Sequence, residues 1–475
     1  MSVSVSDISF KKSAIVTNTT ANGGRKSQIT VVTGAKHNLF PRVTAAERTA
    51  GVTRYRKQFW CNENASDETA YGTLVYIEFP SNGGDRFYLG LGTQTNTQAA
   101  MIVTNTMPAW LGCGILQTAL SGGESSVALT MENDDFEFPN GGYLHLTNKF
   151  KTGQTIDSDV TIGDSVEYSG GTWSKITATT DIEYTNGLYV GSNVVMTVEV
   201  TTNEEWICIA DNLYEDEVIG TGATGVSAPV LATLVHNTNG ICGQLTLLPV
   251  VTAVVGGIDK TVNVAADGTC SGYCTAGELN MTTGVWTTDI SWTVAPDNGT
   301  DITITYRELC YSYSGNVVTV ELSGTVANSY LTTNTYGSGC IESGDVACSS
   351  SGWTETSALG TYDETSYPVV MYNDGTEYDA WTITFTSGVA FNCSGLNEGS
   401  VGSGVVSSSF SPINSATGQP YFTIDLLGWG GTWVSGDTIT FITNPSASPL
   451  WLKEVVPAGT AQVSNNLAVL GYYTE

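Results

Sequence analysis

Basic residues are scarce in this 475-residue chain: 17 Lys and Arg stand against 46 Asp and Glu, which gives a net charge of −29. A surface of this sign repels the phosphates of nucleic acids and anionic lipids, so we expect no nucleic-acid partner. Charged residues nevertheless make up only 13% of the chain, while hydrophobic residues make up 41%. That apolar share is too high for a disordered acidic protein, and at about 100–200 residues per domain the length predicts two to four folded domains.

Histidine is also rare, with three in the chain, and no nucleophile elbow, zinc-protease helix or phosphate-binding loop is present. None of the ten cysteines forms a Cys-x-x-Cys pair, and no histidine accompanies the closest two, Cys270 and Cys274. A zinc site is therefore not expected. Synthesis in the cytosol predicts reduced thiols, and a Cys270–Cys274 or Cys340–Cys348 disulfide is the alternative if the protein ends outside the cell.

Long apolar runs are missing as well. The longest, residues 247–258, is shorter than the roughly 20 residues that cross a bilayer, so no membrane insertion is expected. The first twelve residues contain no apolar stretch of the kind found in secretory signals. These two features predict a protein that is not exported by the standard route.

The few bases are concentrated near the N-terminus. Residues 1–57 hold ten bases and two acids, a net charge of +8, which leaves −37 for the other 418 residues. Residues 1–40 are rich in Ser, Thr and Val, which predicts an extended basic arm that orders against an acidic partner. We favour the acidic body of a neighbouring copy of the chain, or of another subunit in an assembly, as that partner, with a chance surface cluster as the alternative. The bases predicted to make the contact are Lys11, Lys12, Arg25, Lys26 and Lys36.

Strand-like alternation of polar and apolar residues runs through most of the chain, and no long amphipathic helix is evident. The one clear helix signal is short: Thr44 and Glu47 form a capping box, and Gly51 suits a left-handed end. The sequence predicts an all-β fold of several antiparallel β-sandwich domains, with an extended N-terminal arm and one short helix. The expected units are an arm over 1–40, an N-terminal β-sandwich over 41–219, an immunoglobulin-like β-sandwich over 220–310 and a C-terminal β domain over 311–475.

Three stretches resemble virion proteins of tailed bacteriophages. Residues 277–306, which begin Gly-Glu-Leu-Asn-Met-Thr-Thr-Gly-Val-Trp, resemble a small immunoglobulin-like β-sandwich unit common in such proteins. Residues 38–56 resemble the opening of a phage structural protein. Residues 420–459, with the motifs Trp-Gly-Gly-Thr-Trp and Trp-Leu-Lys-Glu-Val-Val-Pro-Ala-Gly, resemble the same kind of tail-associated protein.

The resemblance implies a structural virion component without catalytic residues, associated with the tail as a baseplate, collar or fibre protein. It implies assembly in the host cytoplasm, release by lysis, and partners that are copies of the chain and other virion proteins. Together with the basic arm, it predicts a cyclic homo-oligomer whose arm contacts a neighbouring subunit or a central tube. A capsid decoration protein is a variant of this interpretation.

A host-surface module that binds saccharide is the alternative from another class of function. Trp429 and Trp433 flank a Gly-Gly-Thr turn, where exposed rings could stack on a host glycan. The competing interpretation is that these rings fill the space between two sheets. Adsorption to host cells would separate the two interpretations.

Several acidic clusters are candidates for catalytic or metal sites. Residues 132–137, 215–217 and 363–364 lie beside turn residues, which is typical of solvated faces rather than of the paired carboxylates of a glycosidase, so we predict that the chain is not an enzyme. Residues 132–137 and 373–379 supply hard oxygen ligands of the kind that Ca²⁺ prefers, but neither matches an EF-hand loop. We predict no cofactor, with Ca²⁺ as the one alternative.

Overall fold

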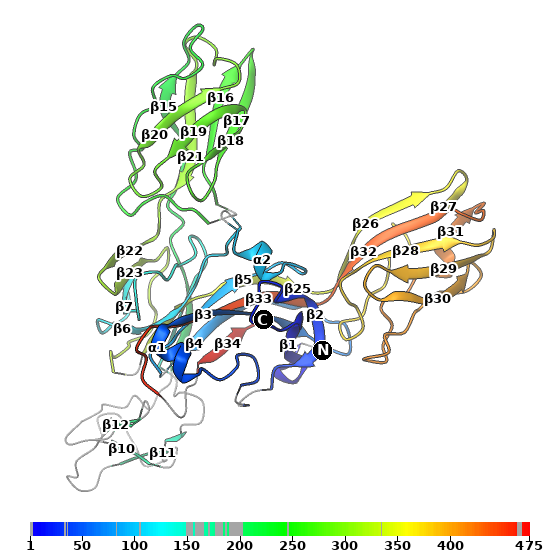
Figure 1. Ribbon diagram of the computed structural model, residues 1–475, viewed down its shortest axis with the longest axis horizontal. Helices are drawn as coiled ribbons and strands as arrows, with labels where there is room; N and C mark the ends of the chain where they lie inside the picture. Colours follow the sequence, from blue (N-terminus) through cyan, green and yellow to red (C-terminus); the bar gives the residue numbers. More distant parts are fainter. Residues whose placement is uncertain are drawn as a thin grey trace.

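The computed structural model describes residues 3–32, 35, 37–81, 83–103, 106–148, 203–244, 247–333, 335–462 and 468–475, together with the backbone of five short strands between 155 and 189. These residues are nearly all β, in several mostly antiparallel sheets with two short α-helices, which confirms the predicted all-β class. Figure 1 shows a central body from which two β lobes project. We call them the middle lobe (residues 213–307, green) and the C-terminal lobe (residues 349–444, yellow to orange).

The central body contains three sheets. The first has the order β2-β1-β3-β33-β5, from β1 (Ile8–Ile15), β2 (Gly23–Thr30), β3 (Val52–Asn62), β5 (Arg86–Leu91) and β33 (Ala447–Val456). The second has the order β25-β4-β34, from β4 (Ala70–Phe79), β25 (Ile341–Val346) and β34 (Val469–Tyr473). The third has the order β14-β8-β24-β6-β7-β23-β22, from β6 (Cys113–Leu116), β7 (Ser126–Thr130), β8 (Tyr143–Thr147), β14 (Glu204–Cys208), β22 (Tyr311–Ser314), β23 (Val317–Glu321) and β24 (Tyr336–Gly339).

The body is discontinuous in sequence, which differs from the predicted consecutive domains. Strand β33 lies between β3 and β5 and pairs with β3 from Val52↔Val456 to Cys61↔Ala447. Strands β22 to β25 complete sheets whose other members come from residues 70–208 and from β34 (Val469–Tyr473). Strands β22 to β25, β33 and β34 therefore belong to the body and not to a separate C-terminal domain. The sequence could not show this, because strand pairing between distant segments leaves no local pattern.

The N-terminal segment is part of the same body. Strands β1 and β2 form a hairpin, and β1 pairs with β3 from Ile8↔Asn62 to Lys12↔Gln58. The structure thus corrects the predicted extended arm over residues 1–40, because pairing with β3 satisfies the backbone groups that a free arm would leave to solvent or to a neighbour.

Helices are few and short. Helix α1 (Ala45–Ala50) begins with the predicted capping box between Thr44 and Glu47 and ends at Gly51, whose φ is +80°. A second helix, α2 (Gln98–Met101), was not predicted. There are also two 3₁₀ turns, η1 (Val5–Asp7) and η2 (Leu426–Gly428).

Five short strands lie between β8 and β14 in the sequence. They are β9 (Thr155–Ile156), β10 (Val166–Ser169), β11 (Thr172–Lys175), β12 (Tyr184–Thr185) and β13 (Leu188–Tyr189).

The middle lobe is a β-sandwich inserted into the body. Its larger sheet has the order β15-β21-β16-β17-β18, and a β19-β20 hairpin covers one face. Val251, Val262 and Ile304 of the sheet pack with Leu279 and Ile290 of the hairpin in one core. The lobe begins with β15, before the predicted boundary at residue 220. Its strands are β15 (Leu213–Thr221), β16 (Val250–Val255), β17 (Ile258–Val264), β18 (Cys270–Gly272), β19 (Cys274–Leu279), β20 (Trp286–Trp292) and β21 (Asp301–Arg307).

The C-terminal lobe is a second insertion, between β25 and β33 of the body. Its main sheet has the order β26-β32-β28-β29-β30, and a small β27-β31 sheet packs beside it. The core between them is rich in aromatic rings, including Trp381, Phe385, Phe422 and Phe441. Its strands are β26 (Ser349–Thr356), β27 (Gly360–Tyr362), β28 (Asp379–Phe385), β29 (Ala390–Gly395), β30 (Gly399–Val405), β31 (Trp429–Gly431) and β32 (Thr438–Asn444).

Candidate functional site

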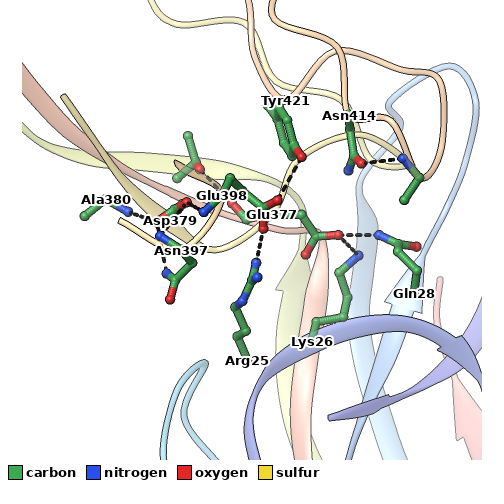
Figure 2. A network of polar contacts seen from close by, with 12 residues as sticks. Arg25, Lys26, Gln28, Glu377, Asp379, Ala380, Asn397, Glu398, Asn414 and Tyr421 are labelled. Carbon is green, nitrogen blue, oxygen red and sulfur yellow. Dashed lines mark hydrogen bonds and ion pairs between the residues drawn. The ribbon is translucent and has the colours of Figure 1, made fainter. Parts of the chain in front are cut away.

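The β1-β2 hairpin meets the C-terminal lobe through charged side chains, and we call this contact the hairpin–lobe junction (Arg25, Lys26, Glu377 and Glu398; Figure 2). The Lys26 ammonium lies 3.0 Å from Oε1 of Glu377, and the two side chains are only 4% and 7% exposed. Arg25 forms an ion pair with Glu398. Glu377 lies in the loop before β28, and Glu398 lies in the turn after β29. The start of β28 and the end of β29 therefore both lie next to the body.

Neighbouring polar groups hold the two acids in place. Gln28 donates a second hydrogen bond to Oε1 of Glu377, and the Tyr421 hydroxyl donates to Glu398 over 2.9 Å. The fully buried Asp379 carboxylate accepts the backbone N–H groups of Ala380, Asn397 and Glu398 (Figure 2). Asp379 thereby fixes the turn that presents Glu398 to Arg25. The junction is a pre-formed contact and not a loose surface pair.

Burial and charge attraction act in opposite directions on the buried pair. Burial lowers the pKa of Lys26, but the attraction of Glu377 and of nearby groups outweighs it and raises the pKa overall. Loss of solvent raises the pKa of Glu377, and this effect outweighs the attraction of Lys26, which acts in the opposite direction. Its second carboxylate oxygen, Oε2, is buried without a hydrogen-bond partner. The negative charge of Glu377 therefore depends on Lys26 and Gln28, so loss of Lys26 would leave a poorly compensated buried carboxylate.

The structure corrects the predicted partner of the N-terminal bases. Four of the five side chains predicted to contact a neighbouring copy already have acceptors in their own chain. Lys11 lies 2.8 Å from Glu63, Lys12 donates to the backbone oxygen of Asn38, and Arg25 and Lys26 pair within the junction. The fifth, Lys36, lies outside the described residues.

Three further bases of residues 1–57, Arg54, Arg56 and Lys57, are buried in the body. Nε of Arg54 on β3 donates to Glu454 on β33 over 2.7 Å. Lys57 is fully buried, and its ammonium donates to the backbone oxygens of Gly24, Thr93 and Asn96 over 2.7, 2.6 and 3.1 Å. Burial lowers the pKa of Lys57 to about 7. The basic side chains of the N-terminal segment thus connect β3 to the β1-β2 hairpin and to β33.

One amide side chain contacts both chain connections at the root of the middle lobe. Nδ2 of Asn140 donates to the backbone oxygens of Asp211 and Glu308, over 3.0 and 2.6 Å, and its Oδ1 accepts the backbone N–H of Cys310. The first two residues flank the lobe on either side, so Asn140 fastens both chain connections to the body. One asparagine beside a Gly-Gly pair is typical of turns in general, so this role could not be predicted from the sequence.

The aromatic turn predicted to face a glycan is part of the C-terminal core. Trp433 is 3% exposed and stacks on Phe385, with ring centroids 4.2 Å apart and planes 4° apart. Trp429 is partly buried and packs edge-on against Phe385 and Tyr362. The predicted glycan-facing role is therefore wrong for Trp433, and the competing interpretation holds: the rings fill the space between two sheets.

Two of the acidic loops that were candidates for catalytic or metal sites make hydrogen bonds within the chain. The Asp135 carboxylate accepts the Tyr88 hydroxyl over 2.7 Å, and burial raises the pKa of Glu132 to about 7. The loop 373–379 docks on the body, where the backbone N–H of Asn373 donates to Asp67. Within the ranges that the structure describes, no group of three or more His, Cys, Asp or Glu side chains is placed to hold a metal ion.

All ten cysteines are free, including the two pairs considered as disulfides. Burial raises the pKa of Cys270 to about 12, so its thiol stays protonated near neutral pH.

No family model, curated protein or solved structure matches the chain. Among the described residues, no helix is long and apolar enough to span a membrane. The arrangement of the chain itself is therefore the basis for assigning a function: a central body, two lobes inserted into it, and buried polar contacts that fix each lobe.

Proposed function

We propose that this protein is a structural component of a tailed-phage virion, associated with the tail, that presents two β-sandwich lobes from a central body. The observation that carries the proposal is the hairpin–lobe junction. A charged pair buried to this degree costs free energy to desolvate and is retained where geometry must be specified, as in a subunit that holds one shape in a particle. The resemblance of residues 277–306 and 420–459 to phage virion proteins supports the same class.

The way the lobes are inserted supports this proposal. Each lobe leaves the body and returns to it, so it is tethered at two points rather than by one linker. Asn140 fastens both connections of the middle lobe, and the junction holds the C-terminal lobe against the hairpin. Two tethers together with buried polar contacts restrict the relative motion that is expected of domains joined by a flexible linker.

The surfaces available for assembly also follow from this arrangement. Because the hairpin bases are occupied within the chain, we assign contacts with further copies and with other virion proteins to the outer surfaces of the lobes. The homo-oligomer that the sequence predicts would then form through the lobes and not through an N-terminal arm.

Electron cryomicroscopy of purified particles tests the proposal. We expect the chain at a fixed copy number in the tail, with both lobes ordered relative to the body. Density on the capsid surface would instead indicate a decoration protein. A chain that is present in the lysate but absent from purified particles, as measured by quantitative mass spectrometry, would contradict the virion role altogether.

A further inference from the structure

The end of the C-terminal lobe that lies away from the body carries a group of exposed aliphatic side chains. We call it the distal tip: the turns at residues 356–360, 385–390, 405–409 and 425–438, next to β27 and β31 in Figure 1. Four of these side chains are more than half exposed: Leu359 (71%), Leu427 (62%), Val389 (61%) and Val434 (55%). Val405 and Leu426 are each 39% exposed.

Backbone contacts bring these turns together. The N–H of Thr432 donates to the oxygen of Leu359 over 3.0 Å, and the N–H of Gly436 donates to the oxygen of Phe385 over 2.9 Å. The turn at Gly388 also lies against Trp433, since a Cβ there would be 3.1 Å from the Trp433 oxygen. These six aliphatic side chains thus belong to one end of the lobe, while three other exposed aliphatic residues of the lobe, Val370, Leu396 and Ile413, lie outside the tip. Grouped exposed apolar residues with a polar rim are typical of interaction surfaces.

A carboxylate lies beside each of two exposed aliphatic residues. Oδ2 of Asp437 accepts the backbone N–H of Val434 over 2.9 Å, and Oδ1 of Asp425 accepts the backbone N–H of Leu427 over 2.8 Å. These bonds keep the turns in shape and hold a negative charge at the backbone of each of these two residues. The exposed Asp363 adds a third charge, and hydrogen bonds from Ser366 lower its pKa.

The lobe contains no positive charge to offset these acids. Residues 349–444 include nine Asp and Glu and no Lys, Arg or His. Four of the nine, Asp374, Glu377, Asp379 and Glu398, lie toward the body, where Lys26 and Arg25 pair with two of them. None of the ion pairs between described residues includes an acid of the tip, so the tip is apolar and uniformly acidic.

We propose that the distal tip is the docking surface for a protein partner that presents Lys or Arg side chains among apolar residues. The aliphatic stem of such a side chain covers Leu427 or Val434 while its charged head reaches Asp425 or Asp437. Complementary charge favours this partner over another copy of the tip, which has the same sign. The inference goes beyond the proposed function and does not depend on it.

The tip is rigid enough to bind without first ordering its loops. The stacked Phe385 and Trp433 rings lie directly beneath it, and the Ser357 hydroxyl donates to Asp437 over 2.7 Å, which ties two of the turns together. A surface that is already ordered loses less conformational entropy on binding.

A peptide titration with the full chain tests the proposal. The probes are a fluorescent amphipathic peptide of Lys and Leu and a matched peptide in which Ser replaces every Leu, with affinity measured by anisotropy at physiological salt. We expect Leu427→Ser/Val434→Ser to weaken binding of the Lys/Leu peptide by about tenfold or more. The matched control is Val230→Ser/Val235→Ser, which removes two exposed aliphatic side chains from the middle lobe and should leave the affinity unchanged.

A second variant separates charge from fold. Asp425→Asn/Asp437→Asn keeps oxygen acceptors for the turn hydrogen bonds but removes two charges, so it should weaken the Lys/Leu peptide and reduce the salt dependence of binding. The proposal is overturned if the Lys/Leu peptide binds both tip variants as well as the unmodified chain, or if the Lys/Ser peptide binds as tightly as the Lys/Leu peptide. It is also overturned if sedimentation shows self-association that the tip variants abolish, because the occupant is then a second copy.

Discussion

Removal of one member of the Lys26–Glu377 pair should weaken the hairpin–lobe junction strongly. At 3.0 Å and an effective dielectric constant of about 20, the attraction between the two charges is about 5 kcal/mol. Desolvation offsets much of this in the intact pair, but a single truncation leaves a buried charge without its partner, which costs about 3–5 kcal/mol. We therefore expect Lys26→Met and Glu377→Leu each to destabilise the junction by about 3 kcal/mol. The double variant should be much closer to the unmodified chain, because neither charge is left alone.

Native-state hydrogen exchange measures this effect locally, which is necessary because the cores of the two lobes are separate from those of the body and need not unfold together with them. A loss of about 3 kcal/mol corresponds to an increase of about a hundredfold in exchange at the amides of β2 and of residues 373–379. The control is Glu63→Gln, which breaks the more exposed Lys11–Glu63 pair of the same hairpin and should cost less than about 1 kcal/mol. The reasoning is refuted if the two single variants exchange no faster than this control.

Three more substitutions test other parts of the structure. Trp433→Ala removes a ring from the C-terminal core and should destabilise that lobe by about 3–5 kcal/mol, as measured by hydrogen exchange. If the lobe stays intact while adsorption to host cells is lost, the glycan-facing interpretation is restored. Lys57→Met removes the ammonium that donates to three backbone oxygens, of which that of Asn96 also accepts the N–H of Gly24, and should cost about 3 kcal/mol. The loss should appear as faster exchange at residues 92–97, and unchanged exchange there would count against this role. Burial raises the pKa of Glu132 to about 7 in the folded chain, so the folded state binds the proton more tightly than the unfolded state and stability falls as pH rises from about 4.5 to 7. Glu132→Gln should remove this fall and raise the free energy of unfolding at pH 8 by about 1–3 kcal/mol, as measured by chemical denaturation. The exposed control Glu215→Gln should not. A stability difference between Glu132→Gln and the unmodified chain that does not vary with pH would contradict the assignment.

Local features of the fold could be predicted from the sequence. The all-β class follows from two-residue alternation, and the capping box at Thr44 and Glu47 was sufficient to place α1. Both signals involve residues within a few positions of one another, so the chain chemistry that creates them can be seen without the fold.

Features that join distant segments could not be predicted. Strand β33 lies between β3 and β5, although about 400 residues separate it from β3. The same holds for the acids that pair with the N-terminal bases: Glu377, Glu398 and Glu454 are distinguished from the other acids only by the fold. The charge asymmetry correctly indicated that the basic segment has an acidic partner, but composition carries no information on whether that partner lies in the same chain.

The position of β33 has a consequence for how the protein is made. A ribosome releases β3 and β5 long before it reaches residues 447–456, which form the strand between them. Until then, both strands have an unpaired edge, and the first sheet of the body cannot close. The two lobes contain all their own strands and can fold while synthesis continues. Closure of the body is thus a late event that requires almost the whole chain, so a prematurely terminated product would carry folded lobes on an incomplete body with open strand edges, a form prone to aggregation.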